Sequence, residues 1–315
     1  MGDANKIAGT DHTAQPGDYH IPVLLTEAVD ALNIKPDGVY VDCTFGGGGH
    51  SKLILSRLGP AGKLIVFDQD EAAKKNVPDD DRIIFVAQNF RHLQRFLRLH
   101  KYPMVDGILA DLGVSSHQFD EPERGFSTRF DATLDMRMDH RQPITAAQVL
   151  QTSTEQELHK MFERYGEVTN AKTLAKTIIT QRQLSPLKTI SRFKQALQHV
   201  VKGNPNKYFA QVFQALRIQV NDEMGALQEM LSQSVASLKP CGRIAIISFH
   251  SLEDRLVKNF FKQGDFETEE NDDVFGRKPE SPLLIISKKP VIAADKELKD
   301  NPRSRSAKLR IAEKK

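Results

Sequence analysis

The stretch VYVDCTFGGGGHS, residues 39–51, decides the fold of this chain. A short apolar strand ends in Asp42 and leads within three residues to four consecutive glycines. Glycine has no Cβ and adopts positive φ, so the backbone here can approach a ligand closely. Residues 50–58 then follow a helical pattern, and a strand, a glycine turn and a helix form the first half of a nucleotide-binding βαβ unit. The stretch predicts a site for an adenosine-type cofactor, and a tight strand-to-helix turn without a ligand is the alternative.

The spacing of the glycines indicates which cofactor is meant. The dinucleotide fingerprint requires Gly or Ala at the sixth place from its first glycine, and counting from Gly46 that place is Ser51. The phosphate-binding loop requires Lys followed by Ser or Thr, whereas Gly49 is followed by His50. Neither pattern fits. The loop therefore favours a cofactor that carries an adenosine but no phosphate, and S-adenosylmethionine is the common one.

A second strand supports this prediction. KLIVFDQD, residues 63–70, reads as a buried strand ending in Asp68. Such folds place a carboxylate on the ribose hydroxyls about 20 residues after the glycines, and an ionised carboxylate can accept hydrogen bonds from both hydroxyls of a vicinal diol. The alternative for Asp68 is an N-cap of the following helix.

The remaining elements predict an α/β fold with an inserted helical domain. Further strands are expected at residues 82–87, 105–111 and 243–249, and strands that alternate with helices are typical of a parallel sheet. Between the last two, apolar residues recur at helical spacing over 158–165, 171–178, 190–201 and 209–220, and Thr154 with Glu157 predicts a capping box before the first of these. The predicted α/β domain covers residues 20–117 and 221–315, and the insertion covers 118–220. Because ligands bind at the carboxyl edge of parallel strands, the insertion should cover the cofactor and select the substrate.

Composition sets outer limits on function. The chain has 315 residues, of which 39% are hydrophobic and 27% charged, as is ordinary for a soluble globular protein. No apolar run reaches membrane-spanning length and residues 1–19 lack the apolar core of a signal peptide, so we expect a cytoplasmic protein with a disordered N-terminal segment. Cys43 and Cys241 are expected to be free, buried thiols, and no metal site is predicted.

Basic residues gather near the C-terminus, although the net charge of the chain is only +3. The alternatives for this run are contact with phosphates and a plain charged tail. It comprises Arg303, Arg305, Lys308, Arg310, Lys314 and Lys315.

Two polar loops should meet at the carboxyl edge of the sheet and supply the reacting groups. Methyl transfer from a sulfonium to an exocyclic amine requires alignment, exclusion of water and an acceptor for the amine hydrogens. Asp111, at the end of the fourth strand, is the leading catalytic candidate, and the alternative is that it only binds cofactor or caps a turn. His250, after the fifth strand, is a second candidate that could orient the substrate or contact phosphate, and the alternative is a structural polar group.

With these residues identified, the chain resembles the MraW family of bacterial 16S rRNA cytosine-N4 methyltransferases over nearly its whole length. The segments that carry the resemblance are long and specific to that family. They are HIPVLLTEAVDAL, DCTFGGGGHS, DGILADLGVSS, ERGFS, LDMRMD, FQALRIQVNDE, ISFHSLEDRLVK and NPRSRSAKLRIAEK.

The resemblance implies a class I, Rossmann-like methyltransferase fold with a helical insertion. The implied reaction transfers a methyl group from S-adenosylmethionine to N4 of a cytidine in the decoding centre of 16S rRNA. The implied partner is that RNA within the small ribosomal subunit, with no membrane, and a homodimer is left open. The cofactor positions carried over from the family are Gly48, Gly49, His50, Asp68, Phe90, Asp111 and Gln118. Gly47 stands where relatives often carry a longer side chain, and residues 261–282 form a shorter segment than in some members.

One feature departs from many enzymes that methylate base amines. They carry a Pro-Pro-aromatic step after the acid of the fourth strand, whereas here Leu112, Gly113 and Val114 follow Asp111. The surface that stacks on an extruded cytosine must then come from elsewhere. Phe249, or an aromatic residue of the insertion such as Phe126, is predicted to provide it. Two other classes stay open: a non-catalytic RNA-binding assembly factor and, less favoured, a nicotinamide-dependent oxidoreductase.

Overall fold

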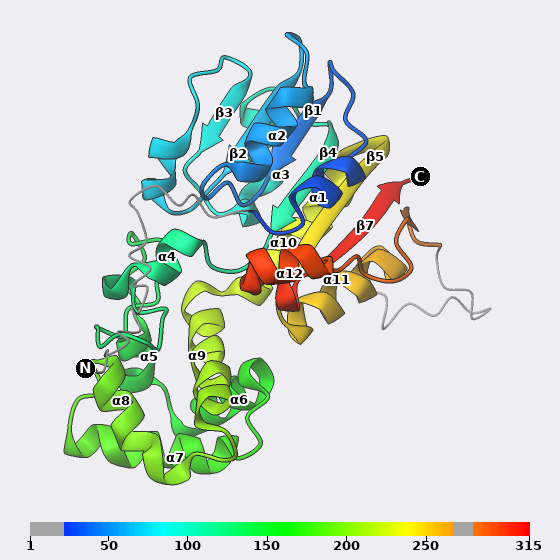
Figure 1. Cartoon of the computed structure of the whole chain (residues 1–315). Helices are drawn as coiled ribbons and strands as arrows, with labels where there is room; N and C mark the ends of the chain where they lie inside the picture. Colours follow the sequence, from blue (N-terminus) through cyan, green and yellow to red (C-terminus); the bar gives the residue numbers. More distant parts are fainter. Residues whose placement is uncertain (1–21, 267–279) are drawn as a thin grey trace, which may run out of the picture.

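The computed structural model describes residues 22–266 and 280–315 (Figure 1). The prediction for residues 1–19 lies outside the described residues, as does most of the segment 261–282. The centre of the fold is a seven-stranded sheet in the order β3-β2-β1-β4-β5-β7-β6. Its strands are β1 (Val39–Asp42), β2 (Lys63–Phe67), β3 (Ile83–Val86), β4 (Val105–Asp111), β5 (Leu238–Ser248), β6 (Leu283–Ile285) and β7 (Lys308–Lys314).

The five predicted strands are all present and pair in parallel, so the α/β prediction is confirmed. The chain runs outward from β1 through β2 to β3, and then returns to place β4 on the other side of β1. That reversal leaves a crevice at the carboxyl ends of β1 and β4, the position at which open α/β sheets bind ligands. The glycine loop and Asp111 both follow from these two strand ends.

Helices cover both faces of the sheet because its central strands are apolar on both sides. Tyr40 and Leu64 contribute to the buried cluster on one face, with α1 (Leu25–Ala31) and α2 (Gly49–Arg57). Val41 and Ile65, one residue further along, contribute to the cluster on the other face, as the period of two in a strand requires. That second face is covered by α3 (Leu93–Leu99), α10 (Glu223–Ser237) and α11 (Ser251–Gln263).

The insertion forms a helical group beyond the strand ends, drawn in green in Figure 1. It contains α4 (Ser116–Asp120), η3 (Pro122–Arg124), α5 (Ala146–Thr152), α6 (Glu155–Gly166), α7 (Ala171–Leu184), α8 (Ile190–Leu197), η4 (Gln198–Val200) and α9 (Pro205–Asn221). Its buried residues form a cluster of their own, between Phe126 and Val220. The capping box of Thr154 and Glu157 is present at the start of α6, as predicted, whereas α5 was not predicted.

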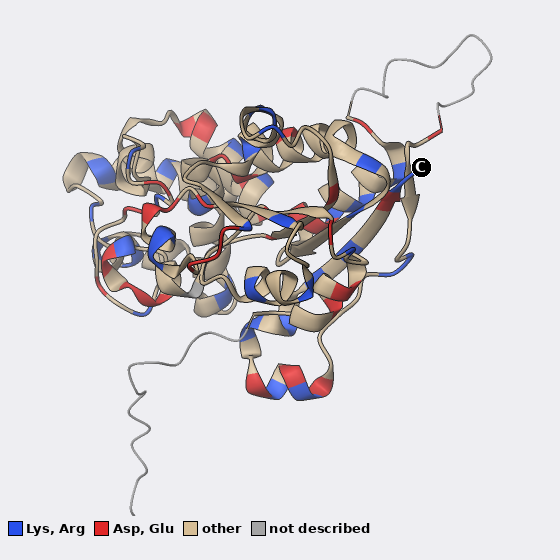
Figure 2. Cartoon of the chain, turned by 90° about the horizontal axis from the view of Figure 1, so that it is seen from above, with Lys and Arg blue, Asp and Glu red and all other residues tan. Residues whose placement is uncertain are grey.

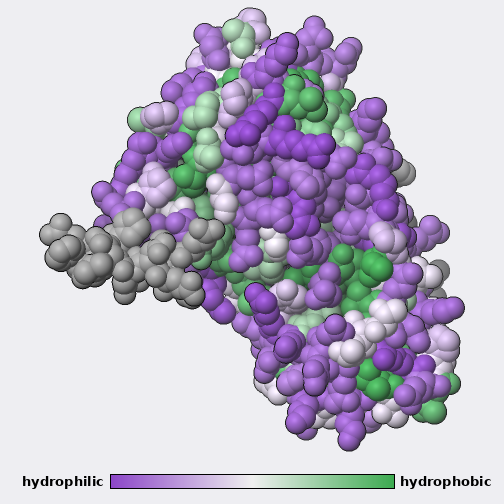
Figure 3. Space-filling model, turned by 180° about the vertical axis from the view of Figure 1, so that it is seen from behind, coloured by the Kyte–Doolittle hydropathy of each residue, from purple (hydrophilic) through white to green (hydrophobic). Residues whose placement is uncertain are grey.

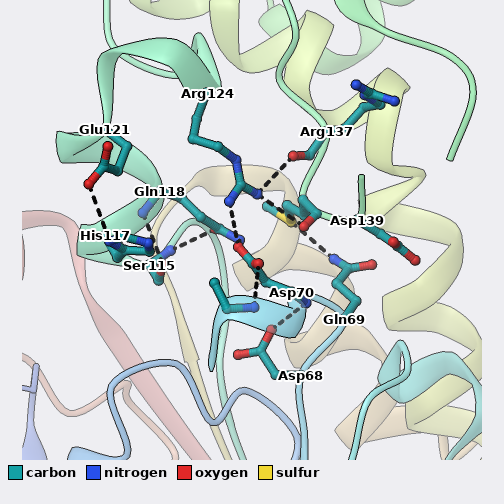
Figure 4. Close-up of polar contacts among 12 residues, drawn as sticks. Asp68, Gln69, Asp70, Ser115, His117, Gln118, Glu121, Arg124, Arg137 and Asp139 are labelled. Carbon is teal, nitrogen blue, oxygen red and sulfur yellow. Dashed lines mark hydrogen bonds and ion pairs between the residues drawn. The ribbon is translucent and has the colours of Figure 1, made fainter. Parts of the chain in front are cut away.

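A buried ion pair joins the insertion to the sheet (Figure 4). Nη1 of Arg124 donates to Oδ2 of Asp70 at 2.7 Å, and each side chain is only 10% exposed. The amide of Gln118 donates to the same carboxylate oxygen at 3.0 Å. Arg124 also donates to the carbonyls of Arg137 and Met138. The loop after β2 is therefore fixed to the first turns of the insertion.

The C-terminal basic run is not a tail. It begins in η5 (Pro302–Ser306), which follows α12 (Asp295–Asp300), and continues as β7 between β5 and β6. Lys308 and Arg310 form ion pairs with Asp254, and the ammonium group of Lys314 donates to two backbone carbonyls. The strand was missed because the density of charged residues hid the alternation of Lys308, Leu309, Arg310 and Ile311, which is typical of a half-buried strand.

Two other surface properties bear on the sequence predictions. Cys43 is buried as expected, but Cys241 is exposed, because it lies in the early part of β5 where the strand is not covered. In the described part of the chain, no helix has the length and apolarity to cross a membrane. Figure 3 shows a mostly hydrophilic face with hydrophobic patches near the junction and on the helical group.

Candidate active site

A cavity of about 1230 Å³ opens at the carboxyl ends of the parallel strands. Its lining comes from the loops after β1, β2, β3 and β4, from α4 and α9–α11, and from η5 near the C-terminus. Six of the predicted site residues line it together: Gly49, His50, Asp68, Phe90, Asp111 and Gln118. Gly48 and His250 do not.

The glycine loop forms one side of the cavity through its backbone. Gly48 is the N-cap of α2 with φ 75°, a left-handed conformation that favours glycine. A Cβ on Gly49 would collide with the ring of Pro22, whereas a Cβ on Gly47 would meet no atom within 4 Å. The open space beside Gly47 agrees with the longer side chains expected in relatives. Gly48 thus shapes the turn, and Gly49 brings the start of α2 to the cavity.

Asp68 is held by the loop that it faces. Its Oδ2 accepts the N–H of Gly46 and its Oδ1 accepts the N–H of Asp70, both at 2.8 Å. Each carboxylate oxygen therefore has one lone pair left for a hydroxyl donor. Burial raises the pKa of Asp68 to about 6, although the two backbone N–H groups partly oppose this. The N-cap of the next helix, η1 (Glu71–Asn76), is Asp70 and not Asp68.

Asp111 is a carboxylate without a protein hydrogen-bond donor among the described residues. Its Oδ1 is buried and unpartnered, and its Oδ2 lies 3.9 Å from Nδ1 of His50. Nε2 of His50 contacts the carbonyl of Val23 at 3.1 Å, so we assign the ring proton to Nε2 and the lone pair to Nδ1. Burial lowers the pKa of His50, which keeps the ring neutral.

Burial and the neighbouring charges all raise the pKa of Asp111. Burial first, and then the nearby charges of Asp42 and Glu253, raise its pKa well above the ordinary value. Asp42 itself has partners, since it accepts the hydroxyl of Ser51 at 2.6 Å and the N–H of Thr44 at 3.0 Å. Asp111 thus differs from Asp42 and Asp68 in that neither of its carboxylate oxygens accepts a donor from the described residues.

Gln118 and Phe90 line the cavity in different ways. The side chain of Gln118 completes a capping box, because its Oε1 accepts the N–H of Ser115 at 3.1 Å and its Nε2 donates to Asp70. Its amide therefore has structural partners. Phe90 opens η2 (Phe90–His92) after β3 and is half-buried, with part of its ring facing the cavity. It offers an apolar surface to a planar ring.

His250 is the N-cap of α11. Its side chain therefore has the structural role that the sequence analysis gave as the alternative to a catalytic one. Its Nδ1 accepts the N–H of Glu253 at 3.5 Å, and its Nε2 lies 3.1 Å from Oε1 of Glu253 without making a hydrogen bond. Glu253 also accepts the N–H of Phe249 at 2.9 Å. The side chain of Ser251, in turn, donates to Glu167 of the insertion. His250 therefore shapes the loop after β5.

Three potential metal ligands lie close together beside this loop: Glu223, His250 and Glu253 have ligand atoms within 4.8 Å of one another. Nδ1 of His250 accepts a backbone N–H, which puts the ring proton on Nε2. Glu223 is bound by the guanidinium of Arg217 at 2.8 and 2.9 Å. Burial acts to raise the pKa of Glu253, but the His250 side chain and the Arg217 charge outweigh it, so its pKa is lowered. Each glutamate of this cluster already has partners within the protein, Arg217 for Glu223 and the N–H of Phe249 for Glu253, and we assign no metal to it.

The two aromatic candidates for base stacking have different environments. Phe249 lines the cavity, and its ring lies beside Gly113, where a Cβ would be 3.8 Å from Cδ2. Phe126 is only 7% exposed, belongs to the core of the insertion and does not line the cavity. Phe126 itself is therefore not available for stacking, because its side chain packs in the core of the insertion. Phe249 stays the prediction, and Phe119, another aromatic residue of the insertion, also lines the cavity.

Sequence reasoning missed several lining residues. Arg217 and Glu223 lie in the motif FQALRIQVNDE, but the helical pattern of its apolar residues hid them. Phe119 and Arg129 also line the cavity. Arg303, which the sequence analysis named as part of the basic run, lines it too, from a segment far away in sequence.

The fold and the site together define the class of S-adenosylmethionine-dependent methyltransferases. They combine an open, mostly parallel sheet with a glycine turn facing a cavity, an acid after β2 and, at the end of β4, an acid with no donor among the described residues. The family model of the MraW methylase family matches residues 18–315, and the chain belongs to this family. The resemblance and the cofactor predicted from the sequence are thereby confirmed, and the oxidoreductase alternative is excluded.

Relatives with a descriptive name agree with this assignment. A protein of Flavobacterium johnsoniae named ribosomal RNA small subunit methyltransferase H is 55% identical over 94% of this chain and 98% of its own length. A protein of the same name from Bacteroides thetaiotaomicron is 52% identical over the same shares. Solved structures resemble the chain only distantly. TrmN of Thermus thermophilus gives a TM-score of 0.42 at 13% identity, over 93% of this chain and 48% of that one.

Proposed function

We propose that this protein transfers a methyl group from S-adenosylmethionine to N4 of a cytidine in the decoding centre of 16S rRNA, within the small ribosomal subunit. Methylation of ribosomal RNA is supported by the names of relatives that are more than half identical to this chain. The choice of the N4 amine and of the decoding centre follows from the family resemblance. We also propose that the protein acts in the cytoplasm, because the proposed substrate is the ribosomal subunit.

The observation that carries the proposal is the unpartnered carboxylate of Asp111. An exocyclic amine needs an acceptor for its hydrogens, both to favour attack by its lone pair and to receive the proton that is released. Asp42 and Asp68, the acids after β1 and β2, already accept protein donors, whereas Asp111 has unused acceptor atoms beside the cavity. Its raised pKa suits proton uptake, and a nearby positive charge would favour the ionised form before reaction.

The other cavity residues would hold the cofactor and exclude water. Asp68 would bind the ribose hydroxyls, Phe90 would cover the adenine, and the loop up to Gly49 with His50 would bound the methionine end. When bound, the cofactor supplies an electrophilic methyl group on a sulfonium, for in-line displacement. Since that chemistry needs no strong base for a nitrogen nucleophile, alignment is the main task of the protein.

Phe249 is proposed to stack on the extruded cytosine. Replacing it with leucine keeps an apolar side chain but removes the ring face, and base–aromatic stacking contributes about 1–3 kcal/mol per base. We expect a higher KM for the RNA substrate with little change in cofactor affinity. The matched control is Phe126→Leu, which loses packing in the insertion but no cavity contact. If Phe249→Leu and Phe126→Leu change KM equally, Phe249 does not stack on the base.

The decisive experiment is transfer of a labelled methyl group to small subunits that lack the modification, followed by nucleoside analysis. We expect label in N4-methylcytidine and none in its C5-methyl isomer. Free 16S rRNA serves as the parallel substrate, because it shows whether the assembled subunit is needed. Label in any other nucleoside would refute the assignment of N4, and no transfer at all would favour the non-catalytic assembly factor.

A further inference from the structure

Two arginines converge on one aromatic ring at the rim of the cavity. Cζ of Arg303 lies 5.4 Å from the ring centroid of Phe119, and Cζ of Arg129 lies 5.9 Å from it. All three residues line the cavity. We call Phe119, Arg129 and Arg303 the entrance cluster.

The entrance cluster is assembled from three separate segments. Phe119 is on α4, Arg129 is in the loop after η3, and Arg303 is in η5, more than 170 residues further along the chain. Nη2 of Arg303 donates to both oxygens of Asp120, at 2.7 and 2.9 Å. This ion pair connects the C-terminal segment to the first helix of the insertion across the rim of the cavity. Both side chains are partly exposed, at 38% and 59%, so the pair contributes little to stability, and the stacking on Phe119 is what holds Arg303 in place.

Both guanidinium groups keep donors available. The bonds of Arg303 within the described residues use only Nη2, which leaves Nε and Nη1. Arg129 is exposed, and its side chain has no hydrogen-bond or carboxylate partner in the described part of the chain. Stacking on an aromatic ring holds a guanidinium in place without using its N–H groups. Each guanidinium held in this way keeps N–H donors for an anion at the rim of the cavity.

We propose that the entrance cluster binds a backbone phosphate of the RNA next to the target nucleotide. This inference rests on the proposed function, since a base that reaches Asp111 must bring its flanking phosphates to the rim of the same cavity. In Figure 2, Lys and Arg alternate with Asp and Glu over the coloured ribbon and do not gather on one face. Contact with the RNA at this site should therefore depend on a few placed cations and not on a general basic surface.

The remaining basic residues near the C-terminus do not compete for this role. Lys308 and Arg310 are paired with Asp254, and Lys314 is bound to carbonyls. Arg305 lies two residues from Arg303 in η5 and is exposed, but it does not line the cavity. It is the natural control.

The test measures binding of the protein to unmodified small subunits over a series of salt concentrations, without cofactor. Each phosphate contact that is lost should reduce the slope of log K against log salt by about 1. We therefore expect Arg129→Gln and Arg303→Gln each to lower this slope and the affinity, with the double variant lower still. Arg305→Gln should match the wild type. Asp120→Asn breaks the same ion pair but keeps the arginine, so it should keep the wild-type slope.

Three results would overturn the proposal. The first is a slope for both arginine variants equal to that of Arg305→Gln. The second is a slope for Asp120→Asn as low as that of Arg303→Gln, which would mean that the ion pair itself matters. The third is a loss of S-adenosylmethionine affinity as large as the loss of RNA affinity, which would assign the arginines to the cofactor. Failure of the proposed function looks different: the wild type would bind subunits with the full slope and form no N4-methylcytidine.

Discussion

The two sides of the cavity are built on different principles. On the cofactor side, the acids Asp42 and Asp68 each accept protein N–H or O–H groups, and a buried His50 is bound to a carbonyl. At the entrance cluster, the exposed Arg129 and the partly exposed Arg303 rest on one ring, and both keep N–H groups that have no partner among the described residues. A rigid polar cradle suits one small ligand of fixed shape, whereas exposed guanidinium groups suit a large polyanion that must arrive and leave. Asp111 lies between them, and its acceptor atoms belong to neither network.

The largest expected effect follows from that intermediate position. Asp111→Asn keeps the shape of the side chain but removes the charge and replaces one acceptor oxygen by a donor. We expect turnover to fall by roughly 10²- to 10⁴-fold, the usual range for loss of a positioned general base, with the affinity for S-adenosylmethionine little changed. Because burial raises the pKa of Asp111, wild-type turnover should also fall as the pH is lowered and the carboxylate is protonated.

Single-turnover rates and cofactor titration of the same variant check this. If cofactor affinity falls as much as turnover does, Asp111 belongs to the cofactor side. Near-normal turnover would limit it to a scaffold role.

The next effect concerns the connection between the two sides. Arg124→Ala leaves the carboxylate of Asp70 buried with one fewer cationic partner, and breaking a buried pair in this way costs about 3–5 kcal/mol. We expect the free energy of unfolding in urea to fall by that amount. The matched control is Arg57→Ala, which removes an exposed pair with Asp30 and should cost about 1 kcal/mol or less. Equal losses in the two variants would show that the junction is not a structural anchor.

The cofactor side was the more predictable of the two from sequence. The glycine loop, Asp68 and Asp111 each follow a strand by a fixed spacing, and parallel strands bring their carboxyl ends to one edge, so local pattern determines three-dimensional position there. Gly48 and His250 show the limit of this reasoning. A residue type in the right loop can cap a helix instead of facing the ligand, and only side-chain direction decides between the two.

The entrance cluster could not be predicted, because it depends on contacts between segments distant in sequence. Arg303 reaches Phe119 only because β7 returns through the sheet and places η5 beside α4. The sequence showed a run of basic residues, but it did not show that Asp254 and backbone carbonyls would occupy several of them. Phe126 was misassigned for a related reason. An aromatic residue near a loop can pack in the core of the neighbouring domain, as Phe126 does, and its sequence position does not reveal this.

A smaller effect tests whether Asp68 binds the ribose as a carboxylate. Its pKa is about 6, so the carboxylate is mostly ionised at pH 7.5 and mostly protonated at pH 5. We expect the affinity for S-adenosylmethionine to weaken as the pH falls through this range. Asp68→Asn should bind roughly 10- to 100-fold more weakly at pH 7.5, as expected for the loss of charge-assisted hydrogen bonds, and its affinity should depend less on pH.

The carboxyl group of Asp68 also affects folding stability, and its effect changes with pH in the opposite direction to its effect on cofactor affinity. A raised pKa favours the protonated form in the folded state, so its contribution to stability is full below the unfolded pKa and is lost as the pH rises through about 6. Isothermal titration at several pH values, with unfolding curves of the free protein, separates the two effects. An unchanged pH profile of affinity in Asp68→Asn would mean that another group binds the ribose.

The smallest expected effect is a change in Tm, which tests whether the cofactor side is as rigid as its hydrogen bonds suggest. Gly49→Ala drives a methyl group into the ring of Pro22, next to Val23, whose carbonyl holds His50. Overpacking of this kind costs about 1–3 kcal/mol, which corresponds to a loss of roughly 2–5 °C in Tm for a protein of this size. Gly47→Ala is the control, because its added methyl meets no atom within 4 Å and should leave Tm unchanged. Both variants are compared without cofactor, so that only the packing of the loop is measured. Equal Tm values would mean that Pro22 and the start of α2 move apart easily, and the contrast between a rigid cofactor side and an adaptable entrance would then be lost.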